Sequence, residues 1–251
     1  MMIFVWFCAL LVMMYSREVE WGEELRKKSG GAWLLDGVSL VMQGIVVPLM
    51  QTTYLYLLLA QCAPAIRGAL SLSPAGSFLL NFVVVDYAYY WNHRLLHGRV
   101  LWRWHAVHHT AERMDVFVTS RNTLWTHFLI VYVWINALGV FVLKDPTYYI
   151  LAASLTAMLD LWRHSEVMPK RRGHFYRLLS RALITPYEHA WHHDREKANC
   201  NFGANLNWWD KIHGTYLAPG VYPERFGVEL EWTVFQKLLF PFRAGSAARL
   251  Y

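Results

Sequence analysis

At 251 residues, with 55% hydrophobic and only 17% charged residues, the chain is too apolar for an ordinary soluble domain and points to a membrane protein. Its formal net charge of +6 indicates basic cytoplasmic loops rather than nucleic-acid binding, because the sequence shows no DNA- or RNA-binding motif. Cys8, Cys62 and Cys200 form no CxxC pair, which argues against an iron–sulfur cluster, a thiolate zinc site and a disulfide framework. We expect a single all-α membrane domain over residues 1–251, whose metal chemistry, if any, uses nitrogen and oxygen ligands.

The N-terminal region combines a short apolar run with a polar connector. Residues 3–15 are apolar but short against the roughly 20 residues of a helical span. A signal-like segment, a short span and an interfacial anchor compete here, and the lack of a basic start and of a cleavage pattern favours the short span. In the polar residues 16–36, Glu and Lys four residues apart predict a short surface helix that ends at Gly30-Gly31, with a solvated connector as the alternative.

Four further apolar runs predict transmembrane helices. Residues 38–63 carry no charge and form the clearest span, with Pro48 as an expected kink. Residues 75–91 lead directly into His93, and residues 124–143 form a further clear span. Residues 147–162 return after a tight turn. The expected architecture is an integral-membrane helical bundle of about four spans, with the N-terminal run as an additional short one, under a cytosolic histidine-rich helical cap.

The distribution of basic residues predicts the orientation of this bundle. If His93 faces the cytoplasm, loops 64–76 and 144–146 lie outside, and of the 24 Lys and Arg residues these loops hold only Arg67 and Lys144. This asymmetry follows the positive-inside rule. We therefore expect the histidines to face the cytoplasm, in a bacterial inner membrane or the endoplasmic reticulum. Two later basic amphipathic stretches, 174–184 and 232–242, are expected to lie in the headgroup plane or to pack on the cap.

Nine of the 12 histidines are clustered at the spacing of metal ligands. They form one HxxxH motif, two HxxHH motifs and one intervening residue: His93, His97, His105, His108, His109, His164, His189, His192 and His193. Residues three and four apart share a helix face, so each motif is expected to present its imidazoles together. Nine imidazoles exceed the four ligands of one tetrahedral zinc and suit two metal ions with four or five nitrogen ligands each.

Residues around these motifs suggest how the ligands are supported. Thr185-Pro186-Tyr187-Glu188 is a capping box that predicts a helix start just before His189. Asp86 and Asp160 are predicted hydrogen-bond partners of the histidines that follow them, with pairing to an arginine as the alternative. The isolated residues His127, His174 and His213 are expected to be structural, and their roles stay open.

Four motifs between about Asp86 and Tyr216 resemble the fatty acid hydroxylase/sterol desaturase superfamily of integral-membrane di-iron oxidases. They are D-x3-Y-W-x-H-R-x2-H, L-W-x2-H-x-V-H-H, T-P-x2-H-x-W-H-H, and a final segment with Asn201, Gly203, Asp210 and Gly214-Thr215-Tyr216. The resemblance implies that the nine histidines are ligands of two iron ions and that Asn201 supports the site. Two features depart from the pattern: Arg121-Asn122-Thr123 replaces an Arg-x-His, and His213 stands where an aromatic residue is usual.

The same resemblance implies O2-dependent hydroxylation, desaturation or oxidative demethylation of a lipid, such as a sterol or a fatty acyl chain. O2 is then a cosubstrate, zinc is a purification substitute for iron, and an external cytochrome b5- or ferredoxin-type donor with its reductase supplies electrons. One rival is a membrane zinc hydrolase, although the sequence has no HExxH motif and more histidines than such a site uses. The other is a non-enzymatic metal-binding or transport protein, although only His127 comes near the interior of a span.

Overall fold

The computed structural model describes residues 2–17, 27–168, 170–171 and 173–241, and over these residues it is all-helical. The part it describes has no β-strand, only three isolated β-bridges. Most of the surface helix expected before Gly30 falls on residues 18–26, outside the described residues. The helices are α1 (Met2–Arg17), α3 (Gly30–Val41), η1 (Met42–Val46), α4 (Val47–Met50), η2 (Gln51–Leu55), α5 (Tyr56–Cys62), η3 (Pro64–Ile66), α6 (Pro74–Leu79), η4 (Leu80–Val85), α7 (Asp86–Leu96), α8 (Trp102–His105), η5 (His108–Thr110), η6 (Val118–Ser120), α9 (Thr126–Leu129), α10 (Val131–Val142), α11 (Thr147–His164), α12 (His174–Leu179), α13 (Pro186–His192), α14 (Trp208–Ile212) and α15 (Val234–Leu239).

The apolar run predicted at 38–63 lies in one continuous helix, from α3 through α5. This helix spans Gly30–Cys62, and within the described residues it is the one helix whose length and apolar composition suffice to cross a membrane. It begins earlier than expected, because Ser29 caps its N-terminus by accepting a hydrogen bond from the Ala32 amide. Gly31 thus opens the helix instead of ending one. A Cβ at Gly31 would lie 2.8 Å from a methyl carbon of Val234, so glycine permits the close approach of α15.

Pro48 lies inside this helix without ending it. Proline lacks the N–H that would bond to the carbonyl four residues earlier. Here the helix continues through α4, and the π-helical segments η1 and η2 lie directly before and after it. Such widened turns are a known way of absorbing an irregularity in a helix. The expected irregularity is therefore present, as a change of helix type on both sides of the proline.

The run predicted at 75–91 lies in a second continuous helix, α6–η4–α7, which carries the first histidines. Ser73 caps its start by accepting a hydrogen bond from the Gly76 amide, and Pro74 occupies the first turn. The helix ends at Leu96, so His93 lies in its last turn and His97 directly follows it. The predicted helical connection between this apolar segment and the first histidine motif is confirmed.

The run predicted as one span at 124–143 is instead broken into α9 and α10. The break is at Ile130, whose φ of −74° and ψ of 119° are extended. The side chain of Asn92 on α7 stabilises it, since its amide donates to the Leu129 carbonyl and its oxygen accepts from the Val131 amide. Asn92 thus satisfies backbone groups that an uninterrupted helix would have paired internally. The prediction of a continuous helix here was wrong.

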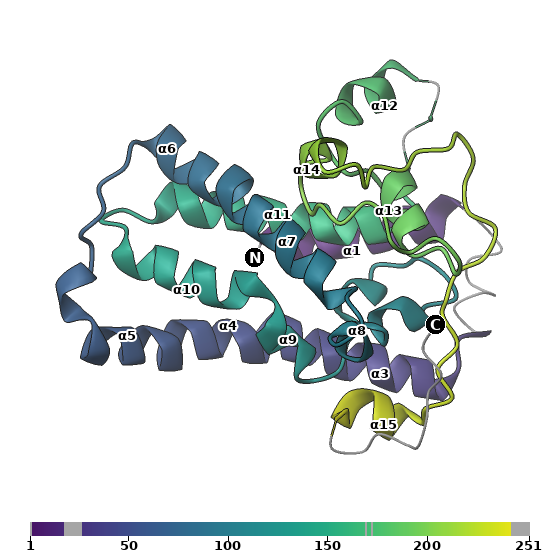
Figure 1. The fold of residues 1–251 in the computed structure, drawn as a ribbon, viewed down its shortest axis with the longest axis horizontal. Coiled ribbons are helices and arrows are strands. Elements are labelled where there is room, and N and C mark those ends of the chain that lie inside the picture. The colour runs from purple at the N-terminus through teal and green to yellow at the C-terminus, as the bar shows by residue number, and fades with distance from the viewer. Residues whose placement is uncertain (1, 18–26, 169, 172, 242–251) are drawn as a thin grey trace.

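The long helices lie side by side along the long axis of the molecule, and the short ones gather at one end (Figure 1). α10 packs against α5 and η2, and α11 packs against α6 and α13. α1 packs on α11, where Leu10 and Met14 share a buried cluster with Leu161. The loops after α5 and α10 meet at the opposite end, where Leu70 and Leu143 form a β-bridge. The fold is thus a helical bundle with a cap at one end.

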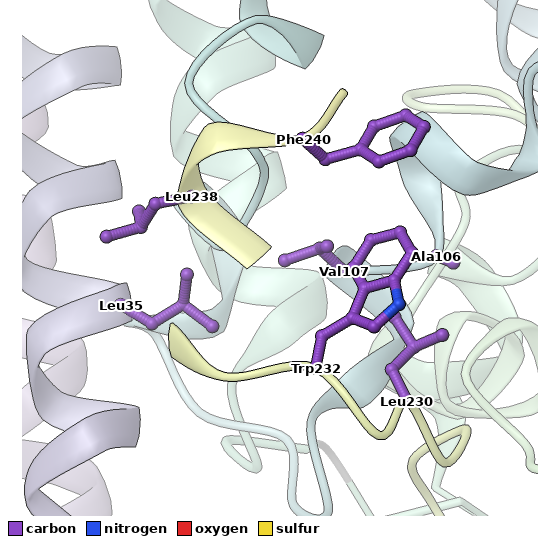
Figure 2. Packing of buried hydrophobic residues seen from close by; sticks show 7 residues of the cluster. All are labelled: Leu35, Ala106, Val107, Leu230, Trp232, Leu238 and Phe240. Carbon is purple, nitrogen blue, oxygen red and sulfur yellow. The ribbon is translucent and has the colours of Figure 1, made fainter. Parts of the chain in front are cut away.

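The two amphipathic stretches of the cap behave differently. α12 leaves Phe175 and Leu178 exposed, so its contact with lipid remains a prediction. α15 instead packs on the cap, which was the alternative for this stretch. Figure 2 shows its cluster joining the start of α3, the turn after α8 and the C-terminal segment: Leu35, Ala106, Val107, Leu230, Trp232, Leu238 and Phe240.

Candidate metal centre

The nine clustered histidines come together in the cap as two adjacent groups. The five-histidine group consists of His93, His97, His105, His109 and His192. The four-histidine group consists of His108, His164, His189 and His193. Within each group, one nitrogen from every ring lies within 4.8 Å of the others. The structure therefore assembles two all-nitrogen sites from segments that are up to 100 residues apart in the sequence.

Each HxxHH motif is divided between the two groups, in opposite ways. In the first motif, His105 and His109 join the five-histidine group and His108 joins the other. In the second, His189 and His193 join the four-histidine group and His192 joins the other. Residues four apart stay together, whereas the histidine three after the first goes to the neighbouring group. Each motif thus presents its three imidazoles together, as expected, with ring centroids at most 5.4 Å apart, but it divides them between two groups.

Local backbone explains part of this division. The α-helix α8 ends at His105, and His108 and His109 lie on the 3₁₀-helix η5. A 3₁₀-helix advances 120° per residue, against 100° for an α-helix, so a face drawn on an α-helix does not hold for this motif. In α13 the helix continues to His192, and His193 follows as its C-cap residue. The sequence spacing thus identified histidines that come together but not their partition.

Burial lowers the pKa of eight of these imidazoles and so favours their neutral form. Burial, reinforced by the neighbouring imidazoles, lowers the pKa of His108 and His193 well below its usual value. Burial also lowers the pKa of His192 to about 3. A neutral imidazole has one N–H and one lone pair, and the lone pair is what binds a metal. Eight of the nine rings are almost fully buried, and His97 is half-buried.

Backbone carbonyls select which ring nitrogen carries the proton in four of the histidines. In the five-histidine group, Nδ1 of His93 donates to the Phe202 carbonyl at 2.9 Å. Nδ1 of His192 donates to the Cys200 carbonyl at 2.7 Å. In the four-histidine group, Nδ1 of His108 and of His164 donate to the carbonyls of Arg121 and Asp160, at 3.1 and 2.8 Å. Each of these rings therefore presents the lone pair of its Nε2 to the centre of its group.

These lone pairs face one another at distances that fit metal binding. Nε2 of His164 lies 3.2 Å from Nε2 of His108 and 2.9 Å from Nε2 of His189. Because the His108 and His164 protons are on Nδ1, no proton lies between their Nε2 atoms, and a cation relieves the repulsion. At a metal–nitrogen bond of about 2.1 Å, two ligands at a right angle lie roughly 3.0 Å apart. His109 and His193 have both ring nitrogens buried without a hydrogen-bond partner among the described residues, and a bound metal would satisfy one nitrogen of each ring.

Asn201 holds the two carbonyls that orient His93 and His192. It lies between Cys200 and Phe202 with a φ of 52°, in the left-handed region that asparagine tolerates. Its amide donates to the carbonyls of Glu188 and Leu217 at 2.7 and 2.8 Å. Its side-chain oxygen accepts from the Leu217 amide. The predicted support by Asn201 is therefore indirect, because it fixes the backbone and touches no imidazole among its described contacts.

The segment after Asn201 is held by Asp210 and by a close backbone approach. The Asp210 carboxylate accepts from the amides of Phe202 and Gly203, both at 2.8 Å. A Cβ at Gly203 would lie 2.5 Å from the Leu206 carbonyl oxygen, so only glycine fits this turn. The segment from Cys200 to Gly203 is thus a rigid backbone support for the five-histidine group. The sequence motif marked these residues but did not reveal that their carbonyls orient the ligands.

The two predicted acidic partners have different roles. Asp86 accepts from the amides of Asn205 and Leu206 and from the indole of Trp209, and its described partners include no histidine. Asp86 lies seven residues before His93, a distance of roughly 10 Å along a helix. The two side chains therefore do not meet, although they share a helix face. Asp160 is nearer to the expectation. Its carboxylate lies 3.3 Å from Nδ1 of His164 and also pairs with Arg163 at 2.6 Å.

The predicted helix start at Thr185 is confirmed. Thr185 accepts a hydrogen bond from the Tyr187 amide, and the Glu188 carboxylate accepts from the Thr185 amide at 3.0 Å. Both partners are buried, and Tyr176 donates a further hydrogen bond to Glu188 at 2.8 Å. This capping box fixes where α13 begins, and therefore where His189 and His192 point.

The three isolated histidines lie outside both groups. His213 stacks on Tyr90, with ring centroids 5.1 Å apart, and its Nε2 lies 3.2 Å from the Tyr87 hydroxyl. It therefore takes the place of the aromatic ring that is usual there. His174 is exposed on α12, whereas His127 is buried on α9.

Sequence reasoning missed one ion pair that supports the site. Arg121, whose carbonyl orients His108, pairs through its guanidinium with Asp36 on α3. Lys28 also pairs with this carboxylate. The sequence did offer a signal for this pair. Asp36 lies beside the uncharged apolar run 38–63, and an acid in such a position needs a partner.

A cavity of about 240 Å³ extends from the histidines into the helical bundle. Its wall includes His93 and His105 of one group and His108, His164 and His189 of the other. Along α11 the wall continues from His164 to Ala153, which is roughly 16 Å of helix. The cavity thus connects both groups with the interior of the bundle.

Comparison with known proteins places this arrangement in a family. The family model described as "Fatty acid hydroxylase" matches residues 78–215, more than half of the chain. An ornithine lipid hydroxylase from Rhizobium tropici is 32% identical over 147 residues, covering 56% of this chain and 42% of that protein. An alkylglycerol monooxygenase from Homo sapiens is 29% identical over 140 residues, covering 55% of this chain and 30% of that protein. A very-long-chain aldehyde decarbonylase from Arabidopsis thaliana is 26% identical over 143 residues, covering 55% of this chain and 23% of that protein.

The chain spans less than half the length of these relatives. No solved structure matches it. The matched residues nevertheless contain all nine clustered histidines and the segment that supports them. The chain therefore belongs to the fatty acid hydroxylase family, as its histidine motifs predicted.

Proposed function

We propose that this chain is an O2-dependent membrane oxygenase that hydroxylates a C–H bond of a lipid at a centre of two iron ions. The observation that carries the proposal is the pair of adjacent all-nitrogen groups on a cavity that enters an apolar helical bundle. The family membership and the names of the relatives, a lipid hydroxylase and a monooxygenase, support the same activity.

The donor set supports two ions of a metal that accepts more than four nitrogen ligands. Tetrahedral zinc uses at most four, whereas one group offers five imidazoles. Imidazole also suits iron, copper and nickel, and family membership favours iron among them. When bound, two irons would supply the activation of O2 and the oxidation of an unactivated C–H bond.

The chain's own residues prepare the site in three ways. The carbonyls of Cys200, Phe202 and Arg121 hold ring protons on Nδ1, so that Nε2 is free to bind the ions. Burial shields the imidazoles from bulk water and would exclude water from the reaction. The capped helix α13 closes the centre by bringing His189 and His192 over the segment that carries His105 and His108.

The cavity supports a substrate that reaches the centre from the bilayer. It runs from the histidines between α7, α10 and α11, so a lipid with its tail among these helices would bring a chain carbon to the ions. The relatives' names make ornithine lipids and alkylglycerols the first substrates to assay, beside sterols and free fatty acids. Desaturation and oxidative demethylation use the same ligand set and are outcomes of the same assay.

The location and the electron supply are also proposals. The loops with Arg67 and Lys144 lie together at the end of the bundle opposite the cap, which supports a cytoplasmic position for the histidines (Figure 1). This membrane is the bacterial inner membrane or the endoplasmic reticulum. Electrons would come from an external cytochrome b5- or ferredoxin-type donor with its reductase, because the sequence contains no dinucleotide-binding fingerprint and no cysteine cluster.

The proposal is tested by metal analysis and lipid mass spectrometry on the same expressed chain. Wild type is compared with His108→Ala and with His174→Ala, which removes an exposed histidine outside both groups. We expect two irons per chain, and an oxygenated lipid in wild type and His174→Ala only. If no lipid gains oxygen or unsaturation when O2 and reductant are supplied, the proposal is wrong. One zinc per chain with lipid hydrolysis would instead support the hydrolase, and metal binding without lipid chemistry the non-enzymatic alternative.

A further inference from the structure

Several buried polar side chains line the cavity with an atom that has no hydrogen-bond partner among the described residues. Apart from Asn81 and the clustered histidines, these atoms are the hydroxyl of Thr119, the side-chain oxygen of Asn122 and Nε2 of His127. These residues are only 7, 6 and 4% exposed, respectively. The described part of the protein offers none of these three atoms a partner. Each is therefore available to a molecule inside the cavity.

The three residues are attached to the metal end of the cavity by two separate contacts. Asn122 follows Arg121, whose carbonyl accepts the proton of His108 at 3.1 Å. His127 follows Thr126, whose hydroxyl bonds to the Trp104 carbonyl, directly before His105. The cavity wall contains His105 and His108 together with all three polar residues. A group bound by them would therefore lie next to both histidine groups.

Each of these groups needs a hydrogen-bond partner in the folded protein, which is water when no ligand fills the cavity. A buried donor or acceptor without a partner lowers the free energy of unfolding by about 1–3 kcal/mol, whereas an apolar group of the same shape carries no such penalty. A site meant only for a hydrocarbon chain would gain from valine, leucine or phenylalanine at these positions. Their polarity is therefore best explained by a polar group that enters the cavity with the ligand.

We propose that Thr119, Asn122 and His127 bind an O–H or N–H group of the substrate, close to the carbon that is oxidised. The side-chain oxygen of asparagine accepts only, so it calls for a donor on the ligand. A hydroxyl can donate to Asn122 and accept from Thr119 and from Nε2 of His127 in the tautomer that carries its proton there. An amide can donate through its N–H and accept through its carbonyl.

The inference narrows the substrate class within the proposed function, on which it rests. The favoured substrates are lipids whose hydroxyl or amide lies a few bonds from the oxidised carbon. A hydrocarbon chain that is polar only at a distant end would leave the three groups unpaired and would bind more weakly. Sites built to pair a polar group discriminate strongly against analogues that lack it, because their own buried groups stay unsatisfied.

The test measures binding to the full chain loaded with zinc, which has no redox chemistry and so cannot turn the ligand over. One probe pair is a hexadecyl glycerol ether with free hydroxyls and the same ether with both hydroxyls methylated. A second pair is a hexadecyl amide and its N,N-dimethyl form. Wild type is expected to bind the unmethylated member of one pair at least about tenfold more tightly, and which pair responds identifies hydroxyl or amide.

Apolar variants then locate the discrimination. Thr119→Val, Asn122→Leu and His127→Phe should each reduce the preference several-fold while the Tm stays equal or rises, because an unsatisfied buried group is removed. Gln51→Leu is the matched control, since Gln51 lines the same cavity elsewhere and donates to the Val133 carbonyl. It should keep the preference. Equal binding of both members of each pair by wild type, or an unchanged preference in all three variants, overturns the inference.

The two proposals fail separately. Loss of probe discrimination with intact lipid oxidation by the iron-loaded chain would refute the polar-group site and leave the oxygenase. Binding that discriminates between the probes, without any lipid oxidation, would refute the oxygenase and leave the polar-group site.

Discussion

Arg121 and Asp36 form a two-pronged ion pair that ties the long apolar helix to the metal centre. Nε and one terminal nitrogen of Arg121 lie 2.6 and 2.9 Å from the two carboxylate oxygens of Asp36. The Asp36 carboxylate is fully buried, and the Arg121 side chain is 7% exposed. The carbonyl of the same arginine orients His108. A contact in the helix that begins at Gly30 thereby fixes a ligand in the cap.

We predict that Asp36→Asn destabilises the protein and weakens metal binding by the four-histidine group. Removing one partner of a buried ion pair leaves the other charge uncompensated, which costs about 3–5 kcal/mol. Thermal unfolding in detergent and metal content check this. Glu229→Gln is the matched control, because it removes the partner of Arg195 on the surface, where such pairs contribute about 0–1 kcal/mol. Equal effects of the two variants would refute the role of the buried pair.

Histidines should group by site and not by motif. His108→Ala is expected to resemble His189→Ala, and His192→Ala to resemble His97→Ala, because these pairs share a group. Each single variant should lower the metal content from two ions toward one. In double variants, two changes within a group should add little to the first, whereas changes in different groups should remove both ions. Titration of the apoprotein with Fe²⁺ under anaerobic conditions measures both. Grouping by motif instead would contradict the partition.

Asn201→Ala should weaken the five-histidine group selectively. The variant loses the hydrogen bonds to Glu188 and Leu217 and places alanine, which tolerates the left-handed conformation less well than asparagine, at a φ of 52°. The carbonyls beside it then no longer hold the rings of His93 and His192, and changes to such supporting contacts typically cost about 10–100-fold in metal affinity.

Competition with a chelator provides the measurement for Asn201. The chelator should remove the ion of the five-histidine group faster than in wild type, while the four-histidine group keeps its ion. Asn201→Gly separates the two causes, since glycine tolerates the conformation but still lacks the amide. If the glycine variant retains wild-type affinity, the hydrogen bonds of Asn201 have no role in metal binding.

Removing the metal should lower stability reversibly. The folded state presents converging lone pairs that only the native arrangement brings together, so ions bind the folded chain preferentially and stabilise it. We expect the Tm to fall by roughly 10 °C or more on chelation, since each kcal/mol corresponds to about 2–4 °C in a chain of this size. Fe²⁺ should restore it and Mg²⁺ should not, because Mg²⁺ prefers oxygen ligands. No change in Tm on chelation would argue against an integral metal centre.

The sequence predicted the features that depend on local pattern. Apolar runs identified the helices that contain Leu59, Val85 and Leu161, and the capping box at Thr185 identified the start of α13. Spacing identified eight of the nine histidines of the two groups, and the family resemblance added His164. These predictions succeeded because each depends on neighbours within a few residues of the chain.

The features that the sequence did not predict depend on distant contacts. The break at Ile130 carries no proline or glycine and is stabilised by Asn92, 38 residues earlier in the chain. The close approach of α15 to the start of the first long helix depends on the fit between Gly31 and Val234. Asp86 bonds to residues 205–209 and not to His93, its expected partner on the same helix face. A periodicity within one segment contains no information on such partners.

The reciprocal division of the two HxxHH motifs has a consequence for the order in which the ions bind. Each ion joins the segment around His109 to the segment around His189, which closes a loop of about 80 residues. The first ion bears the conformational entropy of closing that loop, whereas the second finds its ligands already together. Loading of the wild-type chain, in which both groups are intact, should therefore be positively cooperative. At partial loading, wild-type chains with one ion should be fewer than two independent sites would give, although either ion alone would join the same two segments.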